Sequence, residues 1–427
     1  GSLLGVLLGQ RGYAVDLYER RPQDTGNDGD SGRSINLALS RRGIEALRLA
    51  GLMEEVEPLL IPMEGRMLHL KDGRSQFSSY GQRENEVIYS ISRRDLNRLL
   101  VERAVAATEV NVLFERKCEQ IDFKNKTIKF DQQQQPFDLL IGCDGAGSQV
   151  RRSLMEQVEG RSSSDFLDHD YKELEIPAKE DGSFRLEKNA LHIWPRGNFM
   201  LIALPNLDGS FTVTLFLPKQ GALSFESLDS EKAVRKFFED VFPTAAAAMP
   251  ELVQDFFDHP AGRLGTVRCQ PWHFEDCGLI LGDAAHAIVP FHGQGMNAAF
   301  EDCSELIRLL DAHDEDWGTV NQQFTTTRKP NADAIAEMAL ENYTTMRSTV
   351  TDPKYALKKE IGFELERRYP DKFIPRYSMV MFHTMPYAEA FSAGIQQQSI
   401  LQQLTQTVDR LEEVDWEFAH RLINDEG

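Results

Sequence analysis

The segment 278–297 holds the densest group of residues that could bind a cofactor. An apolar strand over 278–283 delivers Asp283 to its carboxyl end, and a glycine-rich loop then leads into a helix that begins at about Met296. A carboxylate at a strand end can accept hydrogen bonds from ribose or ribityl hydroxyls, and glycines let backbone N–H groups approach a ligand. The partial positive charge at the helix N-terminus stabilises an anion. These features predict a cofactor-binding loop.

Two further acids follow predicted strands. Glu19 ends a strand over 13–19, and Asp144 follows the apolar strand 137–143 and precedes a helix. An acid that ends the second strand of a βαβ unit can accept hydrogen bonds from the ribose of an adenine nucleotide. Each acid also has a simpler explanation. Glu19 would be an ordinary surface acid, and the turn after Asp144 would be a strand-to-helix connection capped by Ser148.

The first residues predict part of a nucleotide-binding unit. Residues 1–12 form an apolar helix that ends at Gly12, and the strand 13–19 follows. This order is typical of the second half of a βαβ unit, in which a glycine-rich turn precedes the helix. We therefore expect the first strand and most of that turn to precede Gly1, which would be the last glycine of a GxGxxG motif.

A hairpin is predicted from strand-like residues on both sides of the turn 71–74. Because 66 and 80 sum to 146, the midpoint is Gly73, and Arg66 and Tyr80 should lie within a step of direct opposition on one face. Strand-like runs over 190–195, 199–204 and 210–217 predict a mostly antiparallel sheet.

The region from Met296 to the end is mainly helical in pattern. Asn342 stands in an otherwise apolar helical stripe with Ile335, Met338 and Met346. A buried amide needs a hydrogen-bond partner, which could be a ligand or, more simply, a neighbouring backbone carbonyl.

Composition excludes several classes of protein. With 47 basic and 67 acidic residues among 427, the formal charge is -20, which disfavours nucleic acid as a general partner. A hydrophobic content of 41% fits a globular chain and excludes a mainly disordered one. The 5 cysteines lack a CxxC pair and predict neither a disulfide framework nor a zinc site, which favours a reducing, cytoplasmic compartment. We find no apolar run long enough for a membrane span and no signal peptide at the start.

Taken together, these motifs resemble those of the class A flavoprotein monooxygenases, which have the p-hydroxybenzoate hydroxylase fold. Within that family they are most similar to the bacterial members that hydroxylate L-kynurenine. The similar segments are 32–40, 191–196, 203–206 and 286–297, and the resemblance extends to 376–379. Eukaryotic members carry a C-terminal membrane anchor, whereas this chain ends with a short amphipathic helix over 414–422, so no anchor is expected.

The resemblance implies an α/β fold with a glutathione-reductase-type Rossmann domain for FAD, interleaved with an antiparallel-sheet substrate domain and followed by C-terminal helices. The expected segments are 1–60, 90–160 and 265–325 for the FAD domain, 61–89 and 161–264 for the substrate domain, and 326–427 for the helical region.

The resemblance also implies two sets of site residues. FAD contacts are expected from Gly1, Tyr18, Glu19, Arg20, Arg21, Ala38, Arg93, Cys118, Asp144, Asp283, Gly293, Gln294, Gly295, Met296 and Asn297. The substrate carboxylate would be held by Arg66, Tyr80, Asn342 and Tyr377, and the aryl ring would contact Ile193, Ile202, Leu204, Thr214, Phe216, Pro290, Phe291 and Met346. No acid–base catalyst or metal ligand is expected, because His286 and His292 are as well explained as structural histidines.

The implied reaction is hydroxylation of L-kynurenine to 3-hydroxykynurenine in tryptophan catabolism and pyridine nucleotide biosynthesis. Bound FAD would be reduced by transiently bound NADPH, react with O2 and transfer oxygen from a C4a-hydroperoxide. The alternatives are a related hydroxylase of a benzoate or salicylate, and a catalytically silent flavin-binding protein. The second is disfavoured by the loop residues Pro290, Phe291 and Gln294. A homodimer is compatible with the sequence.

Overall fold

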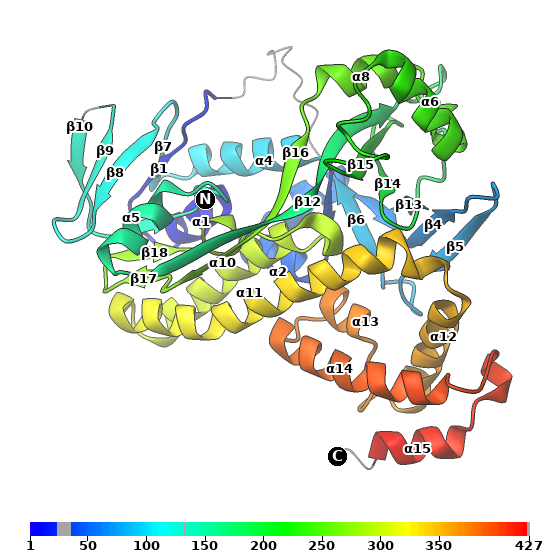
Figure 1. Cartoon of the computed structure of the whole chain (residues 1–427). Coiled ribbons are helices and arrows are strands. Elements are labelled where there is room, and N and C mark those ends of the chain that lie inside the picture. Colours follow the sequence, from blue (N-terminus) through cyan, green and yellow to red (C-terminus); the bar gives the residue numbers. More distant parts are fainter. Residues whose placement is uncertain (24–35, 132, 425–427) are drawn as a thin grey trace. The chain divides into compact units, whose positions relative to one another are not determined.

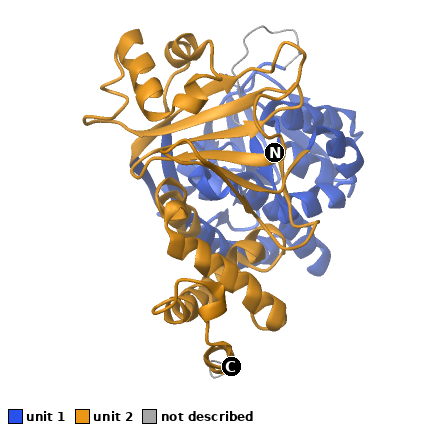
Figure 2. Cartoon of the chain, turned by 90° about the vertical axis from the view of Figure 1, so that its right-hand side faces the viewer, with its two compact units in different colours: residues 1–60, 91–167, 263–336 blue, residues 61–90, 168–262, 337–427 orange. Residues whose placement is uncertain are grey.

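The computed structural model describes residues 1–23, 36–131 and 133–424 (Figure 1). Residue contacts divide the chain into two compact units, each built from three separate segments (Figure 2). Unit 1 comprises 1–60, 91–167 and 263–336, and unit 2 comprises 61–90, 168–262 and 337–427. The predicted interleaved α/β fold is confirmed. The C-terminal helices from residue 337 onward group with unit 2.

Unit 1 contains the nucleotide-type elements, with parallel pairing of β1 with β7 and of β11 with β18. Its elements, in chain order, are α1 (Ser2–Gly9), β1 (Val15–Tyr18), β2 (Leu37–Leu39), α2 (Arg41–Leu49), α3 (Met53–Val56), α4 (Arg93–Ala106), β7 (Val110–Leu113), β8 (Cys118–Asp122), β9 (Thr127–Phe130), β10 (Gln133–Pro136), β11 (Leu140–Gly142), α5 (Gln149–Gln157), β16 (Gly262–Gln270), β17 (His273–Phe274), β18 (Gly278–Ile280), α9 (Asp283–His286) and α10 (Gly295–Ala312).

Short-range sequence signals account for several of these elements. Helix α1 is apolar throughout and packs closely on the strands, because a Cβ on Gly9 would lie only 2.7 Å from Val110. Helix α4 begins after Ser92, whose hydroxyl accepts a hydrogen bond from the Asp95 N–H at 3.2 Å. Ser148 caps α5 in the same way, as the simpler explanation of the turn after Asp144 expects.

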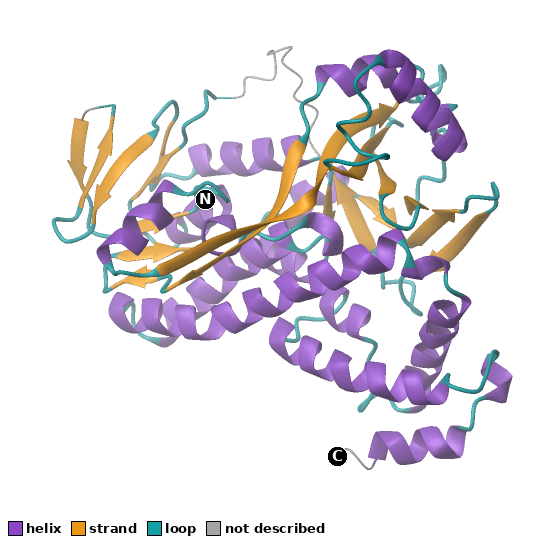
Figure 3. Cartoon of the chain, in the orientation of Figure 1, coloured by secondary structure: helices purple, strands orange, loops and turns teal. Residues whose placement is uncertain are grey.

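Unit 2 is built on a large sheet, whose strands are orange in Figure 3. The sheet is mostly antiparallel, and its strands in this unit follow the order β12-β15-β14-β13-β4-β5. Only the β13–β4 pair in this order is parallel. The elements of the sheet region are β3 (Ile61–Met63), β4 (Gly65–His69), β5 (Ser75–Ser79), β6 (Ile88–Ile91), β12 (Arg161–Ile176, which begins in unit 1), β13 (Ala190–Pro195), β14 (Met200–Pro205), β15 (Phe211–Pro218), α6 (Glu231–Val241), α7 (Pro243–Ala246) and α8 (Leu252–Asp258).

One face of this sheet is covered by α6, α7 and α8. Strand residues such as Trp194, Leu201 and Val213 pack there with Phe238 and Phe242, and all of them are buried. Along each strand, the residues of this apolar cluster alternate with residues on the opposite face. The opposite face is therefore the one that can carry a site.

The remaining helices are α11 (Trp317–Arg347), which runs from unit 1 into unit 2, α12 (Pro353–Arg368), α13 (Arg376–Met381), α14 (Tyr387–Leu404) and α15 (Trp416–Asn424). Helices α12, α14 and α15 share an apolar core that includes Leu357, Ile361, Ile400 and Ile423. No helix among the described residues is long and apolar enough to cross a lipid bilayer.

Candidate flavin and substrate sites

The predicted cofactor loop begins where β18 ends. Gly282 takes a positive φ of 58°, and Asp283 follows it with an exposed side chain at the start of α9. Gly293 also has a positive φ, 65°, just before α10. The N-cap residue of α10, Gln294, makes no capping hydrogen bond with its side chain. An exposed carboxylate and an uncapped helix start are both suited to a polar, partly anionic ligand.

The side chain of Asn297 holds this loop against the segment that precedes α2. Its Oδ1 accepts a hydrogen bond from the Ser40 N–H at 2.9 Å, and its Nδ2 donates to the carbonyls of Ala38 and Gly293, both at 2.8 Å. Gln294 donates to the Ser40 hydroxyl at 3.3 Å. Four of the predicted FAD residues are thus brought together by side chains that brace the loop.

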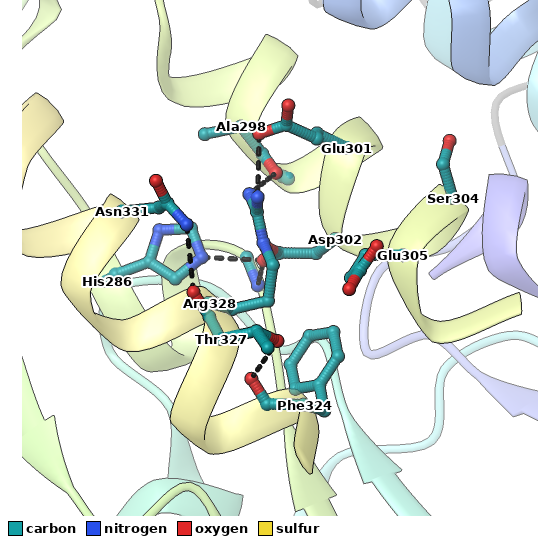
Figure 4. A network of polar contacts seen from close by, with 12 residues as sticks. His286, Ala298, Glu301, Asp302, Ser304, Glu305, Phe324, Thr327, Arg328 and Asn331 are labelled. Atoms are coloured by element: carbon teal, nitrogen blue, oxygen red, sulfur yellow. Dashed lines mark hydrogen bonds and ion pairs between the residues drawn. The ribbon is translucent and has the colours of Figure 1, made fainter. Parts of the chain in front are cut away.

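A buried ionic network lies next to this loop (Figure 4). Asp302 accepts hydrogen bonds from the Gly282 N–H at 2.8 Å, from His286 Nε2 at 2.6 Å and from Arg328 Nε at 2.8 Å. Arg328 also pairs with Glu301 at 2.7 Å. Every partner of Asp302 is therefore a donor, and one of them is the backbone of the turn that presents Asp283.

Electrostatics keeps this network ionised. Burial opposes the charged form of Asp302, but the charges of His286 and Arg328 outweigh it and lower the pKa of Asp302 to about 2. The pKa of His286 is likewise raised, because the Asp302 carboxylate overcomes the effect of burial. His286 is thus an ion-pair partner of Asp302.

The other predicted FAD residues have varied surroundings within unit 1. The Tyr18 hydroxyl donates to Gln135 at 2.8 Å. Glu19 is half-buried and pairs with Arg21 at 3.1 Å, and hydrogen bonds from Arg21 lower its pKa although burial opposes this. Burial raises the pKa of Cys118 to about 11. Gly1 is the N-cap residue of α1, Arg20 and Arg93 are exposed, Gly295 and Met296 open α10, and residues 32–35 lie outside the described residues.

Asp144 has its carboxylate engaged by the protein. It accepts hydrogen bonds from the N–H groups of Gln149 and Val150, at 2.6 and 3.1 Å, and from the Ser148 hydroxyl at 2.5 Å. These contacts are those of a helix-capping acid at the start of α5. They match the simpler explanation, and a contact of Asp144 with FAD stays a prediction.

The predicted hairpin forms, but the predicted register was wrong, because the residue opposite Arg66 lies two positions before Tyr80. Arg66 pairs with Ser78, and Tyr80 lies two positions further along the same face, where its N–H donates to the Glu64 carbonyl at 2.8 Å. The turn centres on Asp72, whose carboxylate accepts a hydrogen bond from the Arg74 N–H at 3.0 Å. This turn shifts the midpoint by one residue, so Arg66 and Tyr80 are diagonal neighbours.

The guanidinium of Arg66 lies beside a stacked pair of tyrosine rings. It is 5.6 Å from the ring centre of Tyr80 and 5.2 Å from that of Tyr377, and these two rings are themselves stacked at 5.4 Å. Arg66 is only 8% exposed, and among the described residues it has no carboxylate partner. Its Nε and the Tyr80 hydroxyl are buried without a hydrogen-bond partner. The tyrosines outweigh burial and raise the pKa of Arg66, so it stays charged.

The predicted ring contacts from the sheet share a face with Arg66. Ile193 pairs with Leu68 and with Ile202, and Ile202 pairs with Thr214. Paired residues point to the same side of a sheet, and so do residues two apart, which adds Leu204 and Phe216 to this face. Thr214 is fully buried, and its hydroxyl has no hydrogen-bond partner in the described part of the chain.

The remaining predicted substrate residues are divided between the units. In unit 2, the Asn342 amide lies 3.4 Å from the Met346 sulfur on α11, and Met346 is buried. Pro290, which is exposed, and Phe291, which is buried, belong to unit 1.

Two features beside the candidate sites were not predicted from the sequence. Asp302 and Arg328 are helix residues whose partners are far away in sequence, although Asp302 stands beside Cys303 on the apolar face of α10 and could have been noticed there. Lys359 on α12 lies in a segment whose sequence carries no motif. Its Nζ donates to the Ser78 hydroxyl at 2.7 Å.

Comparison with known proteins assigns the class. Residues 1–339 match the family model of an FAD binding domain. A tetrameric 2-methyl-3-hydroxypyridine-5-carboxylic acid oxygenase has the same fold, with a TM-score of 0.68 at 18% identity over 83% of this chain and 91% of that one. The family model and the loop of unit 1, whose exposed Asp283 and whose helix start at α10 suit FAD, define an FAD-binding protein.

Relatives of known name narrow the class further. A kynurenine 3-monooxygenase of Stenotrophomonas maltophilia (strain K279a) is 47% identical over 99% of this chain and 94% of its own length. One from Dictyostelium discoideum is 43% identical over 99% of this chain and 95% of its own. The chain belongs to the kynurenine 3-monooxygenase family.

Proposed function

We propose that the protein hydroxylates L-kynurenine at ring carbon 3, using FAD, NADPH and O2. The observation that supports this most directly is the arrangement of unpartnered polar atoms on one sheet face of unit 2. Arg66 offers a buried, charged fork, the kind of group that binds a carboxylate, and Thr214 offers a buried hydroxyl. Buried polar atoms that lack hydrogen-bond partners destabilise a fold, unless a ligand supplies the missing partners.

The spacing on this face suits an aromatic ring that carries a short charged chain. Thr214 lies three strands away from β4, the strand of Arg66, and the paired residues Ile202 and Ile193 lie on the two strands between them. At about 4.8 Å between neighbouring strands, this distance across the sheet is about 14 Å. Apolar side chains line the sheet face between these strands, and the polar groups of Thr214 and Arg66 lie at its two ends. The carboxylate of L-kynurenine would bind Arg66, and its ring would lie on the apolar part.

The chain's own residues act by binding and orientation. Tyr80 and Tyr377 hold the Arg66 guanidinium in place, and the apolar face fixes the ring and excludes water from it. FAD, when bound through Glu19, Ala38, Asp283 and the 293–297 loop, supplies the oxygen transfer by the route expected from the resemblance. No protein base is needed for attack, because the aromatic amine of kynurenine already increases electron density at the ortho carbon.

The test is NADPH oxidation by the FAD-loaded enzyme with and without L-kynurenine, with mass spectrometry of the product. We expect L-kynurenine to accelerate oxidation and to gain one oxygen atom. If benzoate or salicylate is hydroxylated and L-kynurenine is not, the substrate assignment is wrong. If flavin binds and no aromatic acid stimulates oxidation, the enzyme assignment fails for this chain.

A further inference from the structure

Lys359 brings a second cation to the hairpin that carries Arg66. Its Nζ on α12 donates to the Ser78 hydroxyl at 2.7 Å and to the Ser79 carbonyl. Ser78 is the residue paired with Arg66 across the hairpin, so its hydroxyl points to the same face as the guanidinium. The ammonium of Lys359 therefore lies on the face where Arg66 and Tyr80 meet.

The charges of Lys359 and Arg66 are not compensated by the described residues. Neither side chain has an ion-pair partner there, and Lys359 contacts the Phe363 ring at 5.3 Å. The charged and titratable groups that act on this pair are Tyr80, Tyr355, Tyr377 and, on the exposed side of α12, Glu360. Burial and the charge of Arg66 lower the pKa of Lys359 to about 8, so at pH 7 most molecules carry both charges.

Lys359 also has one N–H donor that its two hydrogen bonds to β5 do not use. An ammonium carries three N–H donors, and the two hydrogen bonds to β5 use two of them. The third is left for a ligand. A carboxylate bound at Arg66 would relieve the repulsion between the two cations and could accept this hydrogen bond.

We propose that Lys359 is a second cationic residue of the substrate-carboxylate site, and that it helps the enzyme to select aromatic amino acids with a free carboxylate. The inference rests on the proposed function, since it takes Arg66 as the primary carboxylate anchor. It assigns Lys359 to substrate selection as well as to the attachment of α12 to β5.

The experiment compares two ligands that differ only in the carboxylate. L-kynurenine and kynurenamine, its decarboxylated analogue, are titrated into the FAD-loaded protein, and binding is followed by flavin absorbance. Lys359→Gln removes the charge and keeps a hydrogen-bond donor for β5. We expect it to weaken L-kynurenine binding about tenfold, the order of one lost charge interaction in a half-buried site, and to leave kynurenamine within about twofold.

Two further variants serve as references. Lys358→Gln removes the neighbouring charge, which lines a surface hollow of about 540 Å³ together with Lys354 and Gln402, and we expect no change for either ligand. Lys359→Arg keeps the charge and should keep most of the discrimination. Equal weakening of both ligands by Lys359→Gln would show that Lys359 only braces β5, and no weakening would show that it does not reach the ligand; either result overturns the inference.

The failure of this inference can be told apart from the failure of the proposed function. If the wild-type protein neither binds nor hydroxylates L-kynurenine, the function itself is wrong. If the Lys359→Gln variant does not fold, calorimetry of the wild-type protein at pH 8 in buffers of different ionisation enthalpy replaces it. Binding of L-kynurenine should then take up more protons than binding of kynurenamine, and equal uptake would contradict the inference.

Discussion

Two buried arginines, one in each unit, have opposite surroundings. Arg328 in unit 1 pairs with Asp302 at 2.8 Å and with Glu301 at 2.7 Å, and donates to the Ala298 carbonyl. Arg66 in unit 2 is 8% exposed and meets two tyrosine rings, but no carboxylate among the described residues. A buried charge without a counter-charge is expensive to maintain. The comparison therefore distinguishes a cation that is paired within the fold from one that we propose binds an anionic ligand.

The loop that Arg328 holds is the one expected to bind FAD. Asp302 links Arg328 and His286 to the Gly282 N–H, directly before Asp283. The fully paired cation thus acts on the cofactor site through protein contacts alone. Arg66 has no such counter-charge among the described residues, and its proposed role is direct contact with the substrate.

The largest effect is expected from Arg328→Met. This variant removes one of the two cations beside Asp302, which keeps His286, and one of the two beside Glu301, which keeps Arg42. Breaking the buried Arg328–Asp302 pair should lower the free energy of unfolding by about 3 to 5 kcal/mol. Urea unfolding followed by tryptophan fluorescence measures it. The control is Arg308→Met on α10, where an arginine pairs with Glu305 at 2.7 Å in solvent, and its cost should be about 0 to 1 kcal/mol. Equal losses of unfolding free energy in the two variants would show that the buried pairs of Arg328 stabilise the fold no more than a surface ion pair does.

Arg66→Met should do the reverse and leave stability unharmed. Loss of the anchor should weaken L-kynurenine binding by about 2 to 4 kcal/mol, roughly 30- to 1000-fold, while FAD stays bound. The free energy of unfolding should be unchanged or higher, because an unpaired buried charge is replaced by an apolar side chain. The two measurements are a ligand titration and a urea unfolding curve. A large loss of stability would show that Arg66 is paired within the fold after all.

Asp302→Asn tests whether the paired network is ionic. Asp302 has a pKa of about 2 in the folded protein against about 3.9 unfolded, so its charge stabilises the fold above pH 4, and this contribution is lost as the pH falls towards 2. His286, whose pKa is raised, contributes below its unfolded pKa and loses that contribution as the pH rises through its folded value. The variant should be less stable by about 1 to 3 kcal/mol at pH 6. Urea unfolding curves recorded from pH 6 to pH 2 should show the difference in unfolding free energy between the two proteins becoming smaller as the pH falls.

The smallest effect concerns a buried base that the fold keeps neutral. His69 Nε2 lies 2.9 Å from His192 Nδ1, and burial, His192 and Arg196 lower the pKa of His69 to about 3. The unfolded chain takes up this proton near pH 6.5, so stability should fall as the pH drops, by about 1 kcal/mol between pH 6.5 and 5.5. His69→Gln should flatten this slope in urea unfolding, and an unchanged slope would assign it to other groups.

Local sequence patterns predicted the helices and strands that carry the candidate cofactor loop of unit 1 and the Arg66 hairpin of unit 2. The helix after the glycine-rich loop and the strand before Asp283 follow from the period of their apolar residues and from the glycines between them. The hairpin of Arg66 was also predictable, but not its register, because the Asp72 side chain decides which residue stands at the centre of the turn.

The pairing state of the two arginines could not be predicted from sequence. Arg328 and Asp302 are 26 residues apart, and Arg42, which also pairs with Glu301, is 259 residues from it. Such contacts depend on the packing of α2, α10 and α11 and leave no periodic signal. The same holds for Lys359 and Ser78, which are 281 residues apart.

The most direct test of the account is to titrate L-kynurenine and kynurenamine into the wild-type protein and into Arg66→Met, and to compare the ratio of their dissociation constants. If Arg66 is the carboxylate receptor, the wild-type protein should prefer L-kynurenine by roughly 30-fold or more, and the variant should bind both ligands about equally. An unchanged preference in the variant would contradict the central claim that the unpaired arginine of unit 2 binds the substrate carboxylate.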